Sequence, residues 1–200
     1  MNSIALATED ELSEAVGLQL LAECQLLPRL SPLLLRKNGF GYLRSKMASW
    51  RQMAAHQIVV ILTDLDQKNC PVTLLDDWLG PDRICPDNLL LRIAVREIEA
   101  WVLADHDAMR QLIGPKGHLP LAPDELPDPK QSLLNLAKNA ARNVREDLIA
   151  PRNAIASQGL AYNRRLTEHV RTVWNPERAA ERSPSLMRAR RNLAHIARKL

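Results

Sequence analysis

The chain has 200 residues, of which 46% are hydrophobic and 4% aromatic, so one sizeable domain with a mainly aliphatic core is expected. Its three cysteines form no Cys-x-x-Cys pair and no histidine stands at ligand spacing from them, which argues against a disulfide framework or a zinc site and predicts reduced thiols in the cytoplasm. Acidic residues interrupt the apolar N-terminal stretch and no apolar run reaches about 18 residues, so neither a signal peptide nor a membrane span is expected.

The formal net charge of +4 is unevenly distributed. Residues 164–200 carry ten Lys/Arg and three Asp/Glu, which gives +7, whereas the other 163 residues carry 17 and 20, which gives −3. Such a basic end is typical of a polyanion-binding surface, and equally of the solvated face of ordinary arginine-rich helices.

Residues 3–8 form a short apolar run that we expect to be the first strand. An acidic stretch follows at once and suits the positive N-terminal end of a helix. Glu9 would lie at the carboxyl end of the first strand. For Glu11 and Glu14 we prefer a capping role in that helix, and for Glu9 a functional role.

Residues 57–62 are almost all apolar and rich in β-branched types, as in a central strand that is buried on both faces of a parallel sheet. Asp64 and Asp66 follow at its carboxyl end, where ligands bind in open α/β sheets. Their spacing of two would place both carboxylates on one side of an extended chain. Because two such carboxylates repel each other, the pair predicts a divalent cation beside them.

Between these strands, residues 38–43 predict a turn leading into a short strand, and residues 44–56 a helix. The glycines form no GxGxxG or Walker pattern. Residues 71–79 predict a helix that Gly80 ends. Residues 88–95 predict another buried strand and residues 96–105 a helix, so that Arg96, Glu97 and Glu99 again follow a strand. The succession of apolar strand, acidic tip and helix thus occurs three times.

Five prolines between residues 115 and 129 predict a surface loop over 115–130. Helices are expected over 131–149 and 162–174, from 176, and from 184 to the end. We therefore predict an α/β core over 1–114, with a central, mainly parallel sheet flanked by helices. A helical, basic C-terminal extension over 131–200 would pack on that core.

The acidic tips bear a family resemblance. Glutamate after the first strand and Asp-x-Asp after a later one resemble the Toprim (topoisomerase–primase) arrangement, and the chain is most similar to small bacterial stand-alone Toprim-like proteins of a domain-of-unknown-function family, related to the Toprim domains of overcoming-lysogenization-defect nucleases. The resemblance spans nearly the whole chain. It rests on Thr8-Glu9-Asp10-Glu11-Leu12, Leu62-Thr63-Asp64-Leu65-Asp66-Gln67, Arg92-Ile-Ala-Val-Arg96-Glu97-Ile98-Glu99-Ala100-Trp101, Asp128-Pro129-Lys130, Tyr162-Asn163, Trp174-Asn-Pro and Ser183-Pro-Ser-Leu186-x-Arg188-Ala189.

The resemblance implies a Toprim-like Rossmannoid fold with a Mg²⁺ (or Mn²⁺) site. Glu9 would match the lone Toprim glutamate, and Asp64 and Asp66 the paired aspartates. Toprim enzymes usually have glycine after that glutamate, whereas here Asp10 follows, which puts catalytic competence in question more than metal binding.

Chemistry adds further candidates. Glu97 and Glu99 could complete a second metal position, and Arg96 and Lys130 could face a phosphate. The alternatives are a structural Arg96–Glu97 ion pair and a solvated Lys130. Trp101 is expected in the core.

The resulting hypothesis is a Mg²⁺-dependent nuclease or related phosphoryl-transfer enzyme acting on DNA or RNA, an anti-phage or mobile-element effector beside an ABC-type ATPase. A non-catalytic Toprim-like module that binds nucleic acid or a protein is the alternative. A haloacid-dehalogenase-type phosphatase is disfavoured, because its paired aspartates usually end the first strand and Lys68 stands where that motif has Thr or Val. The oligomeric state, including a homo-oligomer, is left open.

Overall fold

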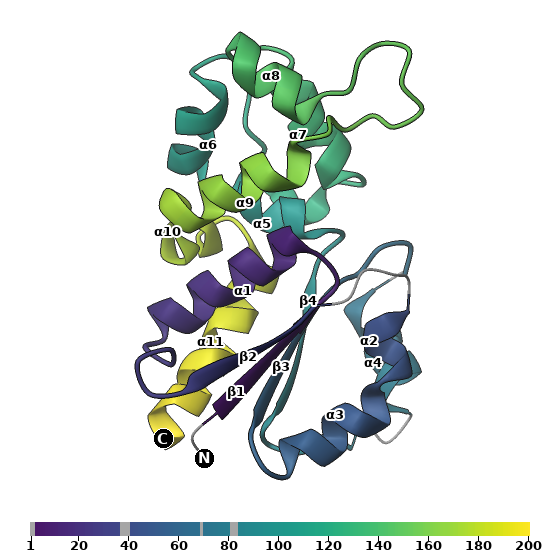
Figure 1. Ribbon diagram of the computed structural model, residues 1–200, viewed down its shortest axis with the longest axis vertical. Coiled ribbons are helices and arrows are strands. Elements are labelled where there is room, and N and C mark those ends of the chain that lie inside the picture. Colours follow the sequence, from purple (N-terminus) through teal and green to yellow (C-terminus); the bar gives the residue numbers. More distant parts are fainter. Residues whose placement is uncertain (1–2, 37–40, 69, 81–83) are drawn as a thin grey trace.

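The computed structural model describes residues 3–36, 41–68, 70–80 and 84–200. At its centre lies a parallel sheet, which within these residues has the order β2-β1-β3-β4 (Figure 1). The strands are β1 (Ser3–Thr8), β2 (Ser31–Arg36), β3 (Ile58–Asp64) and β4 (Leu89–Ala94). β1 and β3 are the inner strands and almost wholly buried, which accounts for their unbroken apolar runs. The predicted α/β class with a parallel, helix-flanked sheet is confirmed.

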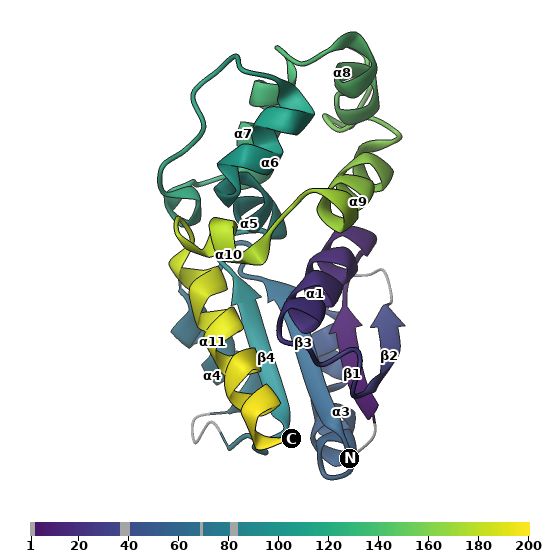
Figure 2. The same ribbon diagram turned by 90° about the vertical axis from the view of Figure 1, so that its left-hand side faces the viewer.

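Helices cover both faces of the sheet (Figures 1 and 2). On one face lie α1 (Glu11–Glu23) and the C-terminal α11 (Pro184–Lys199), and on the other α2 (Tyr42–Ser45), α3 (Met47–Ala54) and α4 (Pro71–Leu79). α1 lies close to β1 because it has glycine at position 17, where a Cβ atom would stand only 2.8 Å from the Leu6 side chain.

Most of the remaining helices form a layer beyond the carboxyl ends of the strands (Figure 1). This layer holds α5 (Ile98–Ala104), α6 (His106–Ile113), a 3-10 turn (Pro123–Glu125), α7 (Pro129–Ala137), α8 (Arg142–Leu148), α9 (Tyr162–Thr172) and α10 (Pro176–Ala180). α11 then returns along the sheet, where Leu186 and Leu193 join the same apolar core as Ile4 and Val60. The C-terminal segment therefore completes one helical layer over the sheet.

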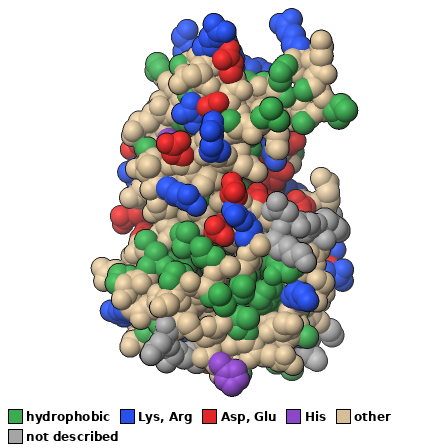
Figure 3. All heavy atoms as spheres, in the orientation of Figure 1, with side chains coloured by type: hydrophobic (Ala, Val, Ile, Leu, Met, Phe, Trp, Pro, Cys, Tyr) green, Lys and Arg blue, Asp and Glu red, His purple; other side chains and the backbone are tan. Residues whose placement is uncertain are grey.

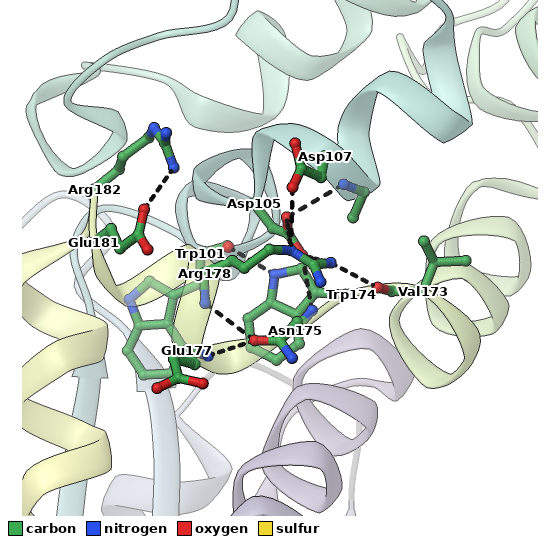
Figure 4. Close-up of polar contacts among 11 residues, drawn as sticks. Trp101, Asp105, Asp107, Val173, Trp174, Asn175, Glu177, Arg178, Glu181 and Arg182 are labelled. Carbon is green, nitrogen blue, oxygen red and sulfur yellow. Dashed lines mark hydrogen bonds and ion pairs between the residues drawn. The ribbon is translucent and has the colours of Figure 1, made fainter.

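A hydrogen-bond network joins α5 to the C-terminal helices (Figure 4). Asp105 is fully buried, and its carboxylate accepts from Arg178 Nε (2.9 Å) and Nη2 (2.7 Å) and from the Asn175 backbone N–H (2.8 Å). Trp174 Nε1 donates to the Trp101 carbonyl (3.0 Å), and Trp101 Nε1 donates to Ser185 Oγ (2.6 Å). Trp101 is completely buried, which confirms its predicted place in the core.

The structure differs from the prediction in three local features, which are β2, α2 and the division of the helix expected over 44–56. Strand β2 was not predicted; it is an exposed edge strand in which Leu33 and Leu34 are 44% and 41% exposed. Figure 3 shows hydrophobic side chains on the half of the molecule that holds the sheet. Residues 42–45 form α2 instead of a short strand, so the helix expected over 44–56 is divided between α2 and α3. Residues 38–40 of the predicted turn lie outside the described residues.

One further difference lies in the C-terminal half, at the end of the predicted loop. Helix α7 begins at Pro129, inside the predicted loop over 115–130, because Asp128 caps it by accepting from the Gln131 N–H at 2.6 Å. Within the described part of the chain, no helix combines the length and the apolar character needed to cross a membrane.

Candidate active site

Three of the predicted acidic residues meet at one pocket. Glu9 follows β1, Asp64 is the last residue of β3, and Asp66 lies two residues beyond it. Because β1 and β3 are parallel neighbours, their carboxyl ends reach the same rim of the sheet. Glu9 Oε1 accepts a hydrogen bond from Thr63 Oγ1 at 3.0 Å, and all three carboxylates line a pocket of about 900 Å³. Figure 3 shows acidic side chains at the level where the helical layer meets the sheet.

The backbone at Asp66 differs from the prediction. Strand β3 ends at Asp64, and Asp66 adopts a left-handed conformation with φ of 50° in the turn that follows. The expected extended chain, with both carboxylates on one side of it, is therefore wrong. Aspartate tolerates this conformation better than most residues do. Asp66 therefore no longer follows the extended course of β3, yet it lines the same pocket as Asp64.

Arg96 holds that turn in place. Its Nη1 donates to the carbonyl oxygens of Asp66 (3.2 Å) and Lys68 (2.9 Å), and its own carbonyl accepts from the Asp66 N–H (2.9 Å). Among the described residues Arg96 forms no ion pair with Glu97, so that structural alternative is wrong. The predicted contact of Arg96 with a phosphate stays untested, while the hydrogen bonds give it a positioning role for Asp66.

The carboxylates at the rim form no close ion pair. Within the described ranges, neither Glu9, Asp64 nor Asp66 forms an ion pair with a lysine, arginine or histidine. Burial raises the pKa of Asp64 well above its ordinary value, and the nearby charges of Glu99, Asp10, Asp66 and Glu9 add to that effect. Burial likewise raises the pKa of Glu9 and of Asp66, and the charge of Lys130 opposes the effect only at Asp66. Negative charge that is compensated so little is what a bound divalent cation would offset.

Glu97 and Glu99 lie beside this group, and both contact Lys130. Glu97 Oε2 accepts from the Lys130 backbone N–H at 3.0 Å. Glu99 is buried, accepts from the Tyr162 hydroxyl at 2.9 Å, and lies 3.8 Å from Lys130 Nζ. The same Nζ stands 5.3 Å from the centre of the Tyr162 ring. Lys130 is therefore placed between an acid and an aromatic ring, while 37% of its side chain stays exposed to solvent.

The remaining acids at the start of α1 have structural roles. Asp10 caps α1 by accepting from the Ser13 N–H at 2.8 Å. Glu11 and Glu14 lie in the first turn of α1, 3.4 and 3.7 Å from Nη1 of Arg36 in β2. The cap of α1 is therefore Asp10, while Glu11 and Glu14 link α1 to β2.

The residues fit a hard divalent cation in one position. Mg²⁺ keeps several waters and binds through one or two protein carboxylates, which Asp64 and Asp66 can supply, with Glu9 beside them. A ready-made cluster of three or more His, Cys, Asp or Glu side chains does not occur in the part of the chain that the structure describes. A second position built from Glu97 and Glu99 fits less well, because Glu99 is already engaged by Tyr162 and Lys130.

Sequence reasoning missed several residues at this site. Thr63, buried in β3, donates to Glu9, and Tyr162 reaches Glu99 from α9. Leu74 and Trp78 of α4 line the apolar side of the pocket. The sequence offers a local signal only for Thr63, which is a hydroxyl in an otherwise apolar strand.

Comparison with known proteins adds no family to this picture. No family model, no curated protein and no solved structure matches the chain. The function is therefore argued from the geometry of the pocket.

Proposed function

We propose that the protein is a Mg²⁺- or Mn²⁺-dependent phosphodiester hydrolase that acts on DNA or RNA. The observation that carries this proposal is the meeting of Glu9, Asp64 and Asp66 at the carboxyl rim of the sheet without a cationic partner among the described residues. The sequence resemblance to Toprim proteins supports the same chemistry.

In this proposal each residue has a defined task. Asp64 and Asp66 hold the ion, directly or through water, and Arg96 fixes the turn that carries Asp66. When bound, the ion polarises a phosphoryl oxygen and stabilises charge on the leaving oxygen. Glu9, oriented by Thr63, accepts a proton from the attacking water, a task that its raised pKa favours.

Lys130 is the proposed contact for substrate phosphate. Its side chain is 37% exposed, and its charge acts on Asp66 as well as on Glu99. A phosphate beside the acids would otherwise meet a strongly negative surface, and a lysine at this point lessens the repulsion.

We further propose that the protein works in the cytoplasm, where its three free cysteines would stay reduced.

The test is cleavage of end-labelled single-stranded and duplex DNA and RNA with Mg²⁺ or Mn²⁺. Cleavage should stop in EDTA and fall by at least about 1,000-fold in Asp64→Ala, as expected for loss of a metal-holding group. Glu146→Gln is the matched control, because Glu146 is an exposed acid paired with Arg142 on α8. Cleavage that survives EDTA or Asp64→Ala would contradict the proposal.

A non-catalytic nucleic-acid-binding module is the second candidate, and the basic face of α11 favours it. Arg188, Arg191 and Arg198 line a groove of about 510 Å³ and form no ion pair within the described residues. Arg190, by contrast, is paired with Glu23. Binding without cleavage would favour this reading.

The salt dependence of binding tests the role of that face. Each phosphate contact contributes about 0.9 to the slope of log K against log salt for duplex DNA, so Arg188→Gln with Arg191→Gln should lower the slope by about 2. Arg190→Gln, whose partner is Glu23, should leave the slope unchanged. An unchanged slope in the double variant would remove this face from the binding surface.

The proposed role as an anti-phage or mobile-element effector, and the proposed ABC-type ATPase partner, rest on the resemblance alone.

A further inference from the structure

The pocket beside the carboxylates has an apolar half that the metal chemistry does not use. Leu43 of α2, Leu65 after β3, and Leu74 and Trp78 of α4 line the pocket together with Glu9, Asp64 and Asp66. Its volume of about 900 Å³ lies in the range of sites that enclose small organic groups. Leu43, Leu65 and Leu74 are almost wholly buried and belong to the core beneath the pocket, whereas Trp78 packs against that core and is only half-buried.

The cations of the pocket are already paired. Arg44 Nη2 lies 2.5 Å from Asp77 Oδ1, and Lys68 Nζ lies 3.1 Å from Asp77 Oδ2. The single carboxylate of Asp77 thus binds Arg44 and Lys68, the two basic side chains in the described lining of the pocket. A phosphate entering the apolar part would have to break these pairs and approach the acids of the rim. For a group of the substrate other than its phosphate, the described lining therefore favours an uncharged one.

If an uncharged group of the substrate binds in this pocket, beside the phosphodiester site, it has to be the organic group that is esterified to the phosphate. Trp78 is the one aromatic side chain in the described lining, and it is half-buried, so that part of its surface remains open to a ligand. A flat aromatic ring binds a nucleobase by stacking, whatever the base. The paired Arg44 and Asp77 at the edge of the pocket offer a donor and an acceptor to the edge of a base.

We propose that this pocket receives an unpaired nucleobase next to the scissile phosphate, so that the substrate is single-stranded nucleic acid. The proposal rests on the proposed hydrolase function for the position of the phosphate. A base within a duplex is stacked and paired and cannot enter a pocket below the rim, whereas a base in a single strand can be turned out at low cost.

Fluorescence of 2-aminopurine tests the pocket without requiring cleavage. The wild-type protein in EDTA would be titrated into a single-stranded oligonucleotide with one 2-aminopurine, into the same strand in a duplex, and into the free 2-aminopurine nucleotide. We expect quenching and at least about tenfold tighter binding of the single strand than of either alternative. Trp78→Ala should weaken binding of the single strand at least about tenfold, which is 1.4 kcal/mol, while Trp78→Phe should keep it within about threefold.

Leu121→Ala is the matched control, because Leu121 is an 83% exposed apolar residue outside the pocket. Circular dichroism melting of each variant shows whether the fold is kept. Equal binding of duplex and single strand, equal binding of the free nucleotide, or a Trp78→Ala protein that binds like Leu121→Ala would each overturn the proposal.

The cleavage assay separates this inference from the proposed function. Metal-dependent cleavage that prefers duplex and is indifferent to Trp78→Ala would leave the hydrolase standing and remove the base pocket. Binding of the single strand that depends on Trp78, without cleavage under any metal, would keep the pocket and remove the hydrolase.

Discussion

Two carboxylates of this protein, the fully buried Asp105 and the partly buried Asp64, are placed in opposite electrostatic surroundings. Asp105 caps α6 through the Ala108 N–H and accepts two hydrogen bonds from the guanidinium of Arg178 and one from the Asn175 N–H (Figure 4). The pKa of Asp64 is raised by burial and by the charges of other acids. The first carboxylate holds distant segments together, whereas the second, kept charged, costs the structure stability.

The first prediction concerns the structural carboxylate and is the largest in free energy. Asp105→Ala should lower the free energy of unfolding by about 3 kcal/mol, because it removes the cap of α6 and leaves the Asn175 N–H and the guanidinium of Arg178, whose side chain is 37% exposed, without their partner. Urea unfolding measures the change. Asp107→Ala is the control, since Asp107 lies 3.7 Å from the same Arg178 but its side chain is 76% exposed. Equal effects of the two substitutions would contradict the contrast.

The second prediction concerns the acid next to the rim that does have partners. Tyr162→Phe removes the hydroxyl that donates to Glu99 at 2.9 Å and should cost about 2 kcal/mol, because a buried charged acceptor loses a donor. Combining it with Glu99→Gln in a double-mutant cycle, by urea unfolding, isolates the coupling of the two side chains. Additive effects would show that this hydrogen bond contributes nothing.

The contrast between the two carboxylates also shows what sequence can predict. Strands β1, β3 and β4 were predicted because their burial on both faces leaves continuous apolar runs, and parallel strands bring Glu9 to Asp64 by topology. The helix over residues 71–79 was predicted because Pro71 and Gly80 mark its ends. These features depend on local pattern and on a general rule of sheet geometry.

The rest depends on contacts between distant segments. Strand β2 contains Pro32 and is exposed at the sheet edge, so it lacks the alternation of a half-buried strand. Arg96 reaches back to the turn after β3, and Tyr162 reaches Glu99 from 63 residues away. Spacing in the sequence carries no sign of such pairs. The conformation of Asp66 is set by that same turn, which the alternation rule for strands does not cover.

The third prediction reverses the usual effect of removing a buried polar group. Asp64→Asn should raise the free energy of unfolding in EDTA near neutral pH by about 1 kcal/mol, the size of a typical single substitution, because the neutral amide ends the repulsion among the acids. With Mg²⁺ at 100 times its Kd the wild type should gain about 2.7 kcal/mol and the variant much less. Thermal unfolding with and without Mg²⁺ measures both, and a variant that is destabilised in EDTA would place Asp64 in the same class as Asp105.

The fourth prediction is the smallest and follows the same carboxylate through pH. Since the folded-state pKa of Asp64 lies above 3.8, its ordinary value, the folded protein binds more protons than the unfolded chain between 3.8 and the raised pKa. Stability in EDTA from this group therefore increases as pH falls through that window and is lost as pH rises through the folded-state pKa. The advantage of Asp64→Asn over wild type should shrink steadily on acidification, because protonation does to Asp64 what the amide does permanently. Subtracting the two pH profiles cancels groups unaffected by the substitution, so a difference that stays constant with pH would mean that Asp64 ionises as freely in the folded protein as in the unfolded chain.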